Sequence, residues 1–222
     1  MSIKQKYRTL LILIFLLSII ISSCEKDEVS YDITGKVYDP QLDKNVSDVK
    51  VVLRGSKVQY GIYNTAYIDL QNTKTSSDGT YSFEVPYETV TGYRFYFQKE
   101  NYFDQLIDVN TDDIQQTDGY RLDIDLIPIA YLDLTIKNTS PQGSDDEIRV
   151  RMTNINVQCK DCWNTETIIG EGPMFSYKRK AMLTGEKDIL INWVVKKGGQ
   201  QHVYNDTIHT HAFKTITYDI NY

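Results

Sequence analysis

Two cysteines and three histidines are the residues of this sequence best suited to bind a metal or to carry out redox chemistry. Cys159 and Cys162 form a Cys-x-x-Cys pair in the stretch CKDCW, and His202, His209 and His211 all lie well downstream. Thiolates and imidazoles are common zinc ligands, and a close cysteine pair can also form a disulfide or exchange electrons. Three interpretations are therefore open: a disulfide, a redox-active dithiol and half of a zinc site.

The spacing of the histidines is compatible with zinc binding, but the sequence does not assemble a complete site. A structural zinc ion takes four protein ligands, so the two cysteines would need two more. His209 and His211 are two residues apart, which places both rings on one face of a strand. Nothing in the sequence brings that strand to the cysteine loop, and histidines are common on exposed strands. We therefore predict no metal site and no cofactor.

The N-terminal residues indicate the compartment, which bears on the state of the cysteines. Lys4, Lys6 and Arg8 precede an apolar run over 10–21 that is broken only by Ser18. A helix needs about 20 apolar residues to span a bilayer. The shorter run and its basic flank are typical of a secretory signal peptide.

The end of this run, Ile21-Ser22-Ser23-Cys24, resembles the lipobox of bacterial lipoproteins, with isoleucine in place of the usual leucine. The resemblance implies that 1–23 is a cleaved signal peptide and that Cys24 is acylated, so that several acyl chains anchor the protein durably in a membrane. The following EKDE looks like the acidic signal that sends some Gram-negative lipoproteins to the outer face of the outer membrane. We expect an outer-membrane lipoprotein on the cell surface or the periplasmic face, with 24–30 as an acidic tether. The alternative is an ordinary secretory signal.

Acylation of Cys24 would leave Cys159 and Cys162 as an even pair in an oxidising compartment. A disulfide that closes the turn before Trp163 is therefore the favoured prediction. The redox interpretation needs a thiol of lowered pKa, typically at a helix N-terminus, and no helical pattern follows Cys162.

Composition excludes one class of partner and favours one class of fold. The chain has 24 basic and 30 acidic residues, a net charge of −6, and three of its basic residues lie in the predicted signal peptide. No cluster of lysine or arginine remains, so we expect no nucleic-acid partner. The 17 tyrosines and the few prolines favour strands over helices.

Apolar and polar residues alternate in short runs over 31–128, at 33–37, 49–54, 81–85, 93–98 and 122–126. Such alternation is typical of half-buried strands, and Asp-Gly pairs between runs are hairpin signals. Several pieces, ITGKVYD at 33–39, VSDVKVVL at 46–53, TSSDGTYSF at 75–83 and KENY at 99–102, look like the carboxypeptidase regulatory-like family. The resemblance implies a transthyretin-like (prealbumin-like) β-sandwich of seven strands that serves as a non-catalytic accessory module. Residues 55–74 are longer than the usual crossover of this family, which leaves the strand order there open.

This longer segment is rich in tyrosine. Tyr60, Tyr63 and Tyr67 are candidate ligand-binding residues, because exposed aromatic rings can stack on sugars or form a protein interface. The alternative is that they pack within the sheet.

Alternation resumes over 129–222, with a hairpin signal at Lys197-Gly198-Gly199. We predict a second β-sandwich, of no recognised family, and hence an all-β chain of two tandem sandwiches. The sequence has no G-x-S-x-G and no H-E-x-x-H motif, so we predict no catalytic residues. The predicted function is capture of a glycan or a protein at the cell envelope. The alternatives are an assembly subunit that docks to an envelope protein and, last, a metal or redox protein.

Overall fold

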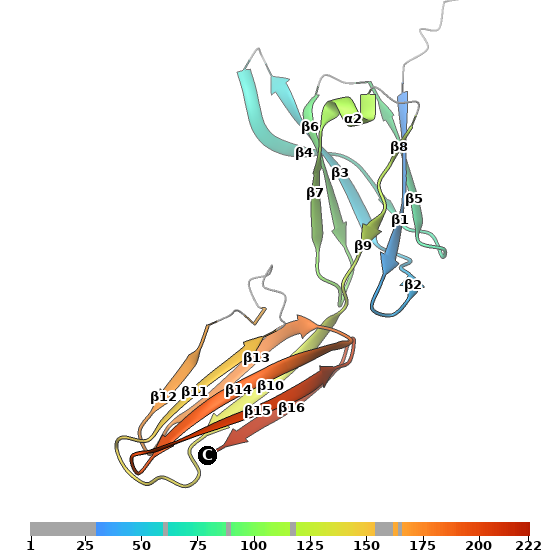
Figure 1. The fold of residues 1–222 in the computed structure, drawn as a ribbon. Coiled ribbons are helices and arrows are strands. Elements are labelled where there is room, and N and C mark those ends of the chain that lie inside the picture. Colours follow the sequence, from blue (N-terminus) through green and yellow to red (C-terminus); the bar gives the residue numbers. More distant parts are fainter. Residues whose placement is uncertain (1–29, 60–61, 88–89, 116–118, 154–161, 164–165) are drawn as a thin grey trace, which may run out of the picture. The chain divides into compact units, whose positions relative to one another are not determined.

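The computed structural model describes residues 30–59, 62–87, 90–115, 119–153, 162–163 and 166–222. Most of these residues form strands, arranged as two consecutive β-sandwiches (Figure 1). The predicted fold class is confirmed. The predicted signal peptide, Cys24 and all of the tether except Ser30 lie outside the described residues. Within the described ranges, no helix is long and apolar enough to cross a membrane.

The first sandwich consists of two facing sheets. One sheet has the order β2-β1-β5, and β8 and β9 pair in parallel with β1. The other has the order β4-β3-β6-β7. Counting β8 and β9 as one interrupted strand gives the seven strands expected, with β2 as a two-residue addition. The bounds are β1 (Ser30–Asp39), β2 (Lys44–Asn45), β3 (Lys50–Gln59), β4 (Ile62–Lys74), β5 (Thr80–Pro86), β6 (Val90–Gln98), β7 (Gln105–Val109), β8 (Tyr120–Arg121) and β9 (Ile124–Asp125).

Two local features of the first sandwich differ from the expectation. The long segment after β3 is not a crossover, because β4 returns beside β3 as a hairpin that continues the sheet, with register shifts at Leu53/Arg54 and Ser56/Val58. A short helix, α2 (Thr111–Gln115), buries Ile114 where the sequence shows no helical period. One turn of helix is too short to leave a periodic pattern.

The second sandwich packs a sheet of order β13-β10-β16 against one of order β12-β11-β14-β15. The predicted hairpin is confirmed: Gly198 and Gly199 link β14 to β15 with φ of 53° and 77°, and two-residue hairpin turns of this type need positive φ at both positions. The bounds are β10 (Ile129–Lys137), β11 (Glu147–Thr153), β12 (Ile168–Glu171), β13 (Ser176–Thr184), β14 (Lys187–Lys197), β15 (Gln200–Thr210) and β16 (Thr215–Asn221).

Each sandwich has its own hydrophobic core. The first centres on aromatic rings such as Phe95, which is fully buried beside Phe83 and Phe97 with ring centroids 6.3 Å from each. The second is aliphatic, around residues such as Leu134, and includes the fully buried Trp163. A small third cluster of Phe103, Ile129 and Cys162 lies where the chain passes from one core to the other.

Candidate functional site

The open edge of the second sandwich holds a groove of about 580 Å³. β15 and β16 are outer strands of the two facing sheets (Figure 1). The Tyr218 hydroxyl donates a hydrogen bond of 2.6 Å to Asp206, which links the two strands partway along. On the hairpin side of this link the groove is lined by Gln200, His202 and Tyr204 of β15, and by Asn221 and Tyr222.

A pair of stacked aromatic rings lies in the groove. Trp193 of β14 and Tyr204 of β15 are direct cross-strand partners, with ring centroids 5.5 Å apart and planes inclined by 15°. Their stacking fixes both rings without help from a ligand. Tyr204 is 44% exposed although it projects from the inner face of its sheet, so part of its ring is open to a bound molecule.

The loop between β10 and β11 forms one wall of the groove and is held by a buried carboxylate. Asp146 accepts hydrogen bonds from the Gln142 amide at 2.9 Å and from the Asn138 side chain at 2.8 Å. These donors lower the pKa of Asp146 below its ordinary value, and the backbone amide of Gln142 has the largest effect. Lys197 crosses from β14 to donate to Asn138 and to the Ser140 carbonyl, both at 2.8 Å. The wall is therefore preorganised.

Most of the other polar residues of the groove are uncharged groups that can form hydrogen bonds. The residues that line the groove include Gln142, Gln200, His202 and Asn221. Lys197, the charged residue among those that line it, lies with its ammonium 4.7 Å from the centre of the Tyr222 ring and is already hydrogen-bonded to the loop. An aromatic surface beside amide and imidazole groups can stack on an apolar ring face and bond to hydroxyl groups around it.

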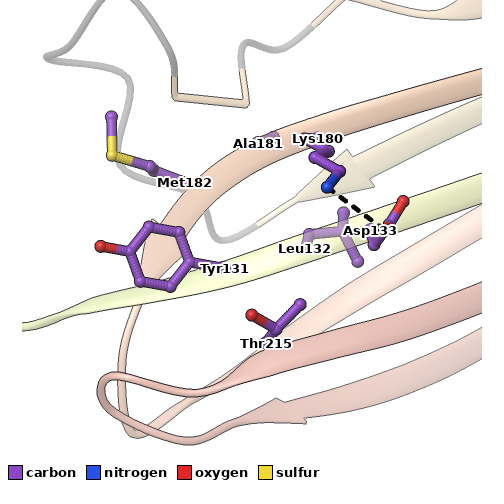
Figure 2. A pocket seen from close by; sticks show the side chains of 7 residues that line it. All are labelled: Tyr131, Leu132, Asp133, Lys180, Ala181, Met182 and Thr215. Atoms are coloured by element: carbon purple, nitrogen blue, oxygen red, sulfur yellow. Dashed lines mark ion pairs between the residues drawn. The ribbon is translucent and has the colours of Figure 1, made fainter.

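A second concavity, of about 410 Å³, lies on the outer face of the β13-β10-β16 sheet. Figure 2 shows its lining, with Lys180 directed towards Asp133 across the strands. Their charged atoms are 3.9 Å apart, and Lys180 is largely exposed. The Tyr131 hydroxyl is bonded to Asn101 at 2.8 Å. Among the described residues that line this concavity there is no stacked aromatic pair, and its ion pair is of the weak surface kind, so the groove is the better candidate.

The structure places only part of the predicted tyrosine site. Tyr60 and the side chain of Tyr63 lie outside what the structure describes. Tyr67 is half-buried, and the guanidinium of Arg94 lies 4.1 Å from the centre of its ring. Gly92 leaves room for the Tyr67 hydroxyl, which is 3.2 Å from where a Cβ would be. Tyr67 thus packs across the sheet, and ligand binding by the three tyrosines stays a prediction.

Cys162 is buried and tied to β13. It forms an isolated bridge with Met182, and the next residue, Trp163, donates its amide to the Met182 carbonyl at 3.2 Å. Arg179 donates to the Cys162 carbonyl at 3.3 Å. Cys159 lies outside the described residues, so the disulfide stays a prediction.

His209 and His211 lie side by side, as their spacing predicted, and the residue that joins them is Glu186. The two ring centroids are 4.9 Å apart. The pKa of His209 is raised, and its hydrogen bond to Asp188 has the largest effect. The pKa of Glu186 is lowered, and the hydrogen bond that it accepts from the Ala212 amide has the largest effect. Sequence reasoning missed Glu186, although counting outward from the Gly-Gly turn pairs Asp188 with His209 and puts Glu186 next to His211.

No protein-family model and no curated protein matches the chain. Among solved structures, the shaft pilin SpaA from Lactobacillus rhamnosus GG aligns over 87% of this chain and 97% of its own, with 9% identity and a TM-score of 0.33. The minor pilin GBS52 of Streptococcus agalactiae aligns over 86% and 95%, with 12% identity and a TM-score of 0.29. The 3-chlorocatechol 1,2-dioxygenase of Rhodococcus opacus aligns over 46% and 61%, with 14% identity and a TM-score of 0.32. Likenesses this distant assign neither family nor function, and the carboxypeptidase regulatory-like resemblance stays a prediction.

Proposed function

We propose that this chain is a non-catalytic, lipid-anchored protein of the cell envelope that captures carbohydrate in the groove of its second sandwich. The lipobox-like end of the N-terminal run supports the anchor at Cys24, and the acidic residues after it support the outer membrane. The observation that carries the binding function is the Trp193–Tyr204 stack in a groove with amide and imidazole groups.

Carbohydrate fits this groove better than a charged ligand does. The ammonium of Lys197 is engaged by Asn138 and Ser140, so the described residues that line the groove offer no uncommitted cation for a carboxylate or a phosphate. A sugar ring has one apolar face and a rim of hydroxyl groups, which matches an aromatic surface in a groove that is also lined by Gln142, Gln200 and His202. The volume of about 580 Å³ is within the range of small-ligand sites.

The test is a screen of the purified full chain against immobilised glycans, followed by affinity measurement on the best ligand. Removal of one aromatic contact of about 1–1.5 kcal/mol weakens binding about 5- to 13-fold, so Tyr204→Ala should do so. Tyr87→Ala is the matched control, because Tyr87 is an exposed tyrosine of the first sandwich, outside the groove. Binding that Tyr204→Ala leaves intact, or no binding to any glycan, would refute the proposal.

A second candidate function is docking of an envelope protein by strand addition. β15 is an edge strand of eleven residues, and its first eight are exposed on both faces. Long exposed edges readily accept an added strand. Val203→Pro would prevent pairing along this edge, whereas Tyr204→Ala would leave its backbone free to pair. A partner that cross-links on cells to the wild type and to Tyr204→Ala but not to Val203→Pro would favour docking over carbohydrate capture.

A further inference from the structure

Three metal-ligand side chains meet at the end of β15 away from the groove. Glu186, His209 and His211 each offer a ligand atom, and these atoms all lie within 4.8 Å of one another. They come from two segments, since Glu186 belongs to the two-residue connection between β13 and β14. This cluster differs from the cysteine-based zinc site considered from the sequence.

The backbone holds these segments together independently of any metal. Thr210 is fully buried between the two histidines, and its hydroxyl donates to the Thr184 carbonyl at 2.7 Å and accepts from the Lys187 amide at 2.9 Å. Burial of Thr210 turns His209 and His211 outward together, because alternate residues of a strand share a face. Glu186 has a φ of 51° and accepts the Ala212 amide at 2.9 Å, which fixes the connection against the end of β15.

Each histidine places one ring nitrogen near the Glu186 carboxylate, at a distance slightly longer than the ligand separations of a zinc site. Nε2 of His209 is 3.7 Å from one Glu186 oxygen, and Nδ1 of His211 is 3.8 Å from the other. Zinc bond lengths of about 2.0–2.2 Å imply tetrahedral ligand separations of roughly 3.3–3.5 Å. Since the three ligand atoms lie within 4.8 Å of one another, side-chain shifts of about 1 Å would bring them to these separations.

Asp188 supplies the supporting contact that metal-bound histidines usually have. Its carboxylate lies 2.7 Å from Nδ1 of His209, which leaves Nε2 of that ring facing Glu186. Metal-bound histidines usually donate their second nitrogen to a carboxylate or a carbonyl, which fixes the tautomer. With both imidazoles neutral, Glu186 and Asp188 together carry two negative charges, which a divalent cation would neutralise.

We propose that Glu186, His209 and His211 bind a zinc-class divalent cation, with Asp188 orienting His209 and one coordination position left open. Imidazole ligands select zinc and similar transition metals, whereas calcium and magnesium require oxygen ligands. Two histidines and one glutamate are a three-ligand set that leaves a fourth position to water or to a donor from a partner. The site is separate from the groove and does not depend on carbohydrate binding.

The test is calorimetric titration of zinc into the full chain, which is purified through a histidine-free tag, stripped of metal with a chelator and then dialysed free of the chelator. We expect saturable one-to-one binding that His209→Ala and His211→Ala each weaken at least 100-fold. Asp188→Asn should weaken it about 10-fold, as loss of an outer contact usually does. His202→Ala is the histidine control, because His202 lies on the same strand among the groove residues, and its zinc affinity should equal that of the wild type.

Cobalt substitution identifies the ligands independently. Cobalt bound by nitrogen and oxygen gives visible bands without the near-ultraviolet charge-transfer band of a cobalt thiolate. A thiolate band, zinc binding that survives the double variant His209→Ala/His211→Ala, or calcium binding as tight as zinc binding would each overturn the proposal. Circular dichroism of the two single-histidine variants should match that of the wild type, which separates loss of ligands from loss of fold.

Discussion

Replacement of one buried ring should destabilise the first sandwich without destabilising the second. Phe95 is fully buried between Phe83 and Phe97, and Phe→Ala in a packed core costs about 3–5 kcal/mol. A domain of about 100 residues loses roughly 4–8 °C of Tm per kcal/mol. Phe95→Ala should therefore lower the Tm of the first sandwich by at least about 12 °C, and remove much of a total stability of about 5–15 kcal/mol.

The chain contains a selective probe for this experiment. Its two tryptophans, Trp163 and Trp193, both belong to the second sandwich, so tryptophan fluorescence follows that sandwich alone while calorimetry follows both. Phe95→Ala should move one calorimetric transition and leave the fluorescence transition in place. Leu134→Ala, which costs about 2–5 kcal/mol in the second core, should do the reverse.

The matched control is Leu106→Ala. Leu106 lies on β7, beside the strand that carries Phe95, but is 48% exposed, so its loss should change stability by no more than about 0.5 kcal/mol. If Phe95→Ala shifted the fluorescence transition as far as the calorimetric one, the two sandwiches would unfold as a single cooperative unit. The contact of Tyr102 with Phe213, whose ring centroids are 5.3 Å apart, would then couple the cores strongly, and the argument from separate cores would fail.

Three further predictions follow from single side chains. Several donors, of which the Ser76 hydroxyl has the largest effect, lower the pKa of Asp78 to about 2. The stability that ionised Asp78 adds to the fold is complete above its ordinary pKa of 3.8 and is lost as the pH falls through about 2. An NMR titration of Asp78 with a midpoint near 4 would contradict this prediction. Asp146→Asn removes the charged acceptor of the Gln142 amide, which holds the loop that forms one wall of the groove. This variant should therefore bind glycan severalfold more weakly in the same affinity assay, and an unchanged affinity would contradict the prediction. Cys24→Ala should move the protein from the membrane fraction to the soluble fraction, and its retention in membranes would refute lipid anchoring.

Local sequence patterns predicted the strands and the β14–β15 hairpin well, because both depend on residues that are close together in the sequence. Alternation reports which side of a strand is buried, and the Gly-Gly pair at 198–199 specifies a two-residue turn and thereby the register of β14 and β15. The same register implied that Glu186 and Asp188 accompany the histidines. The cluster was missed because the histidines were considered with the cysteines rather than with their partners across the hairpin.

The groove could not be predicted in the same way. Alternation places Trp193 and Tyr204 on the inner face of their sheet, where aromatic residues are expected to be core. The accessibility of the two rings depends on how the edge strands β15 and β16, which belong to different sheets, lie relative to each other. That arrangement is set by residues distant in sequence. The β3–β4 hairpin was missed for a related reason, since its register shifts interrupt strict alternation.

Both sandwiches pair their first strand in parallel with their last, and this arrangement determines how each would respond to mechanical load. Tension along the chain pulls two parallel neighbours from opposite ends, so the hydrogen bonds between them are sheared together instead of being peeled apart singly. β10 and β16 are in continuous register from Tyr131/Thr215 to Lys137/Asn221. β1 pairs with β8 and β9 over only two positions each, with a gap between. A pull from the N-terminal side against a load at the C-terminal strand should therefore open the first sandwich while the second still holds.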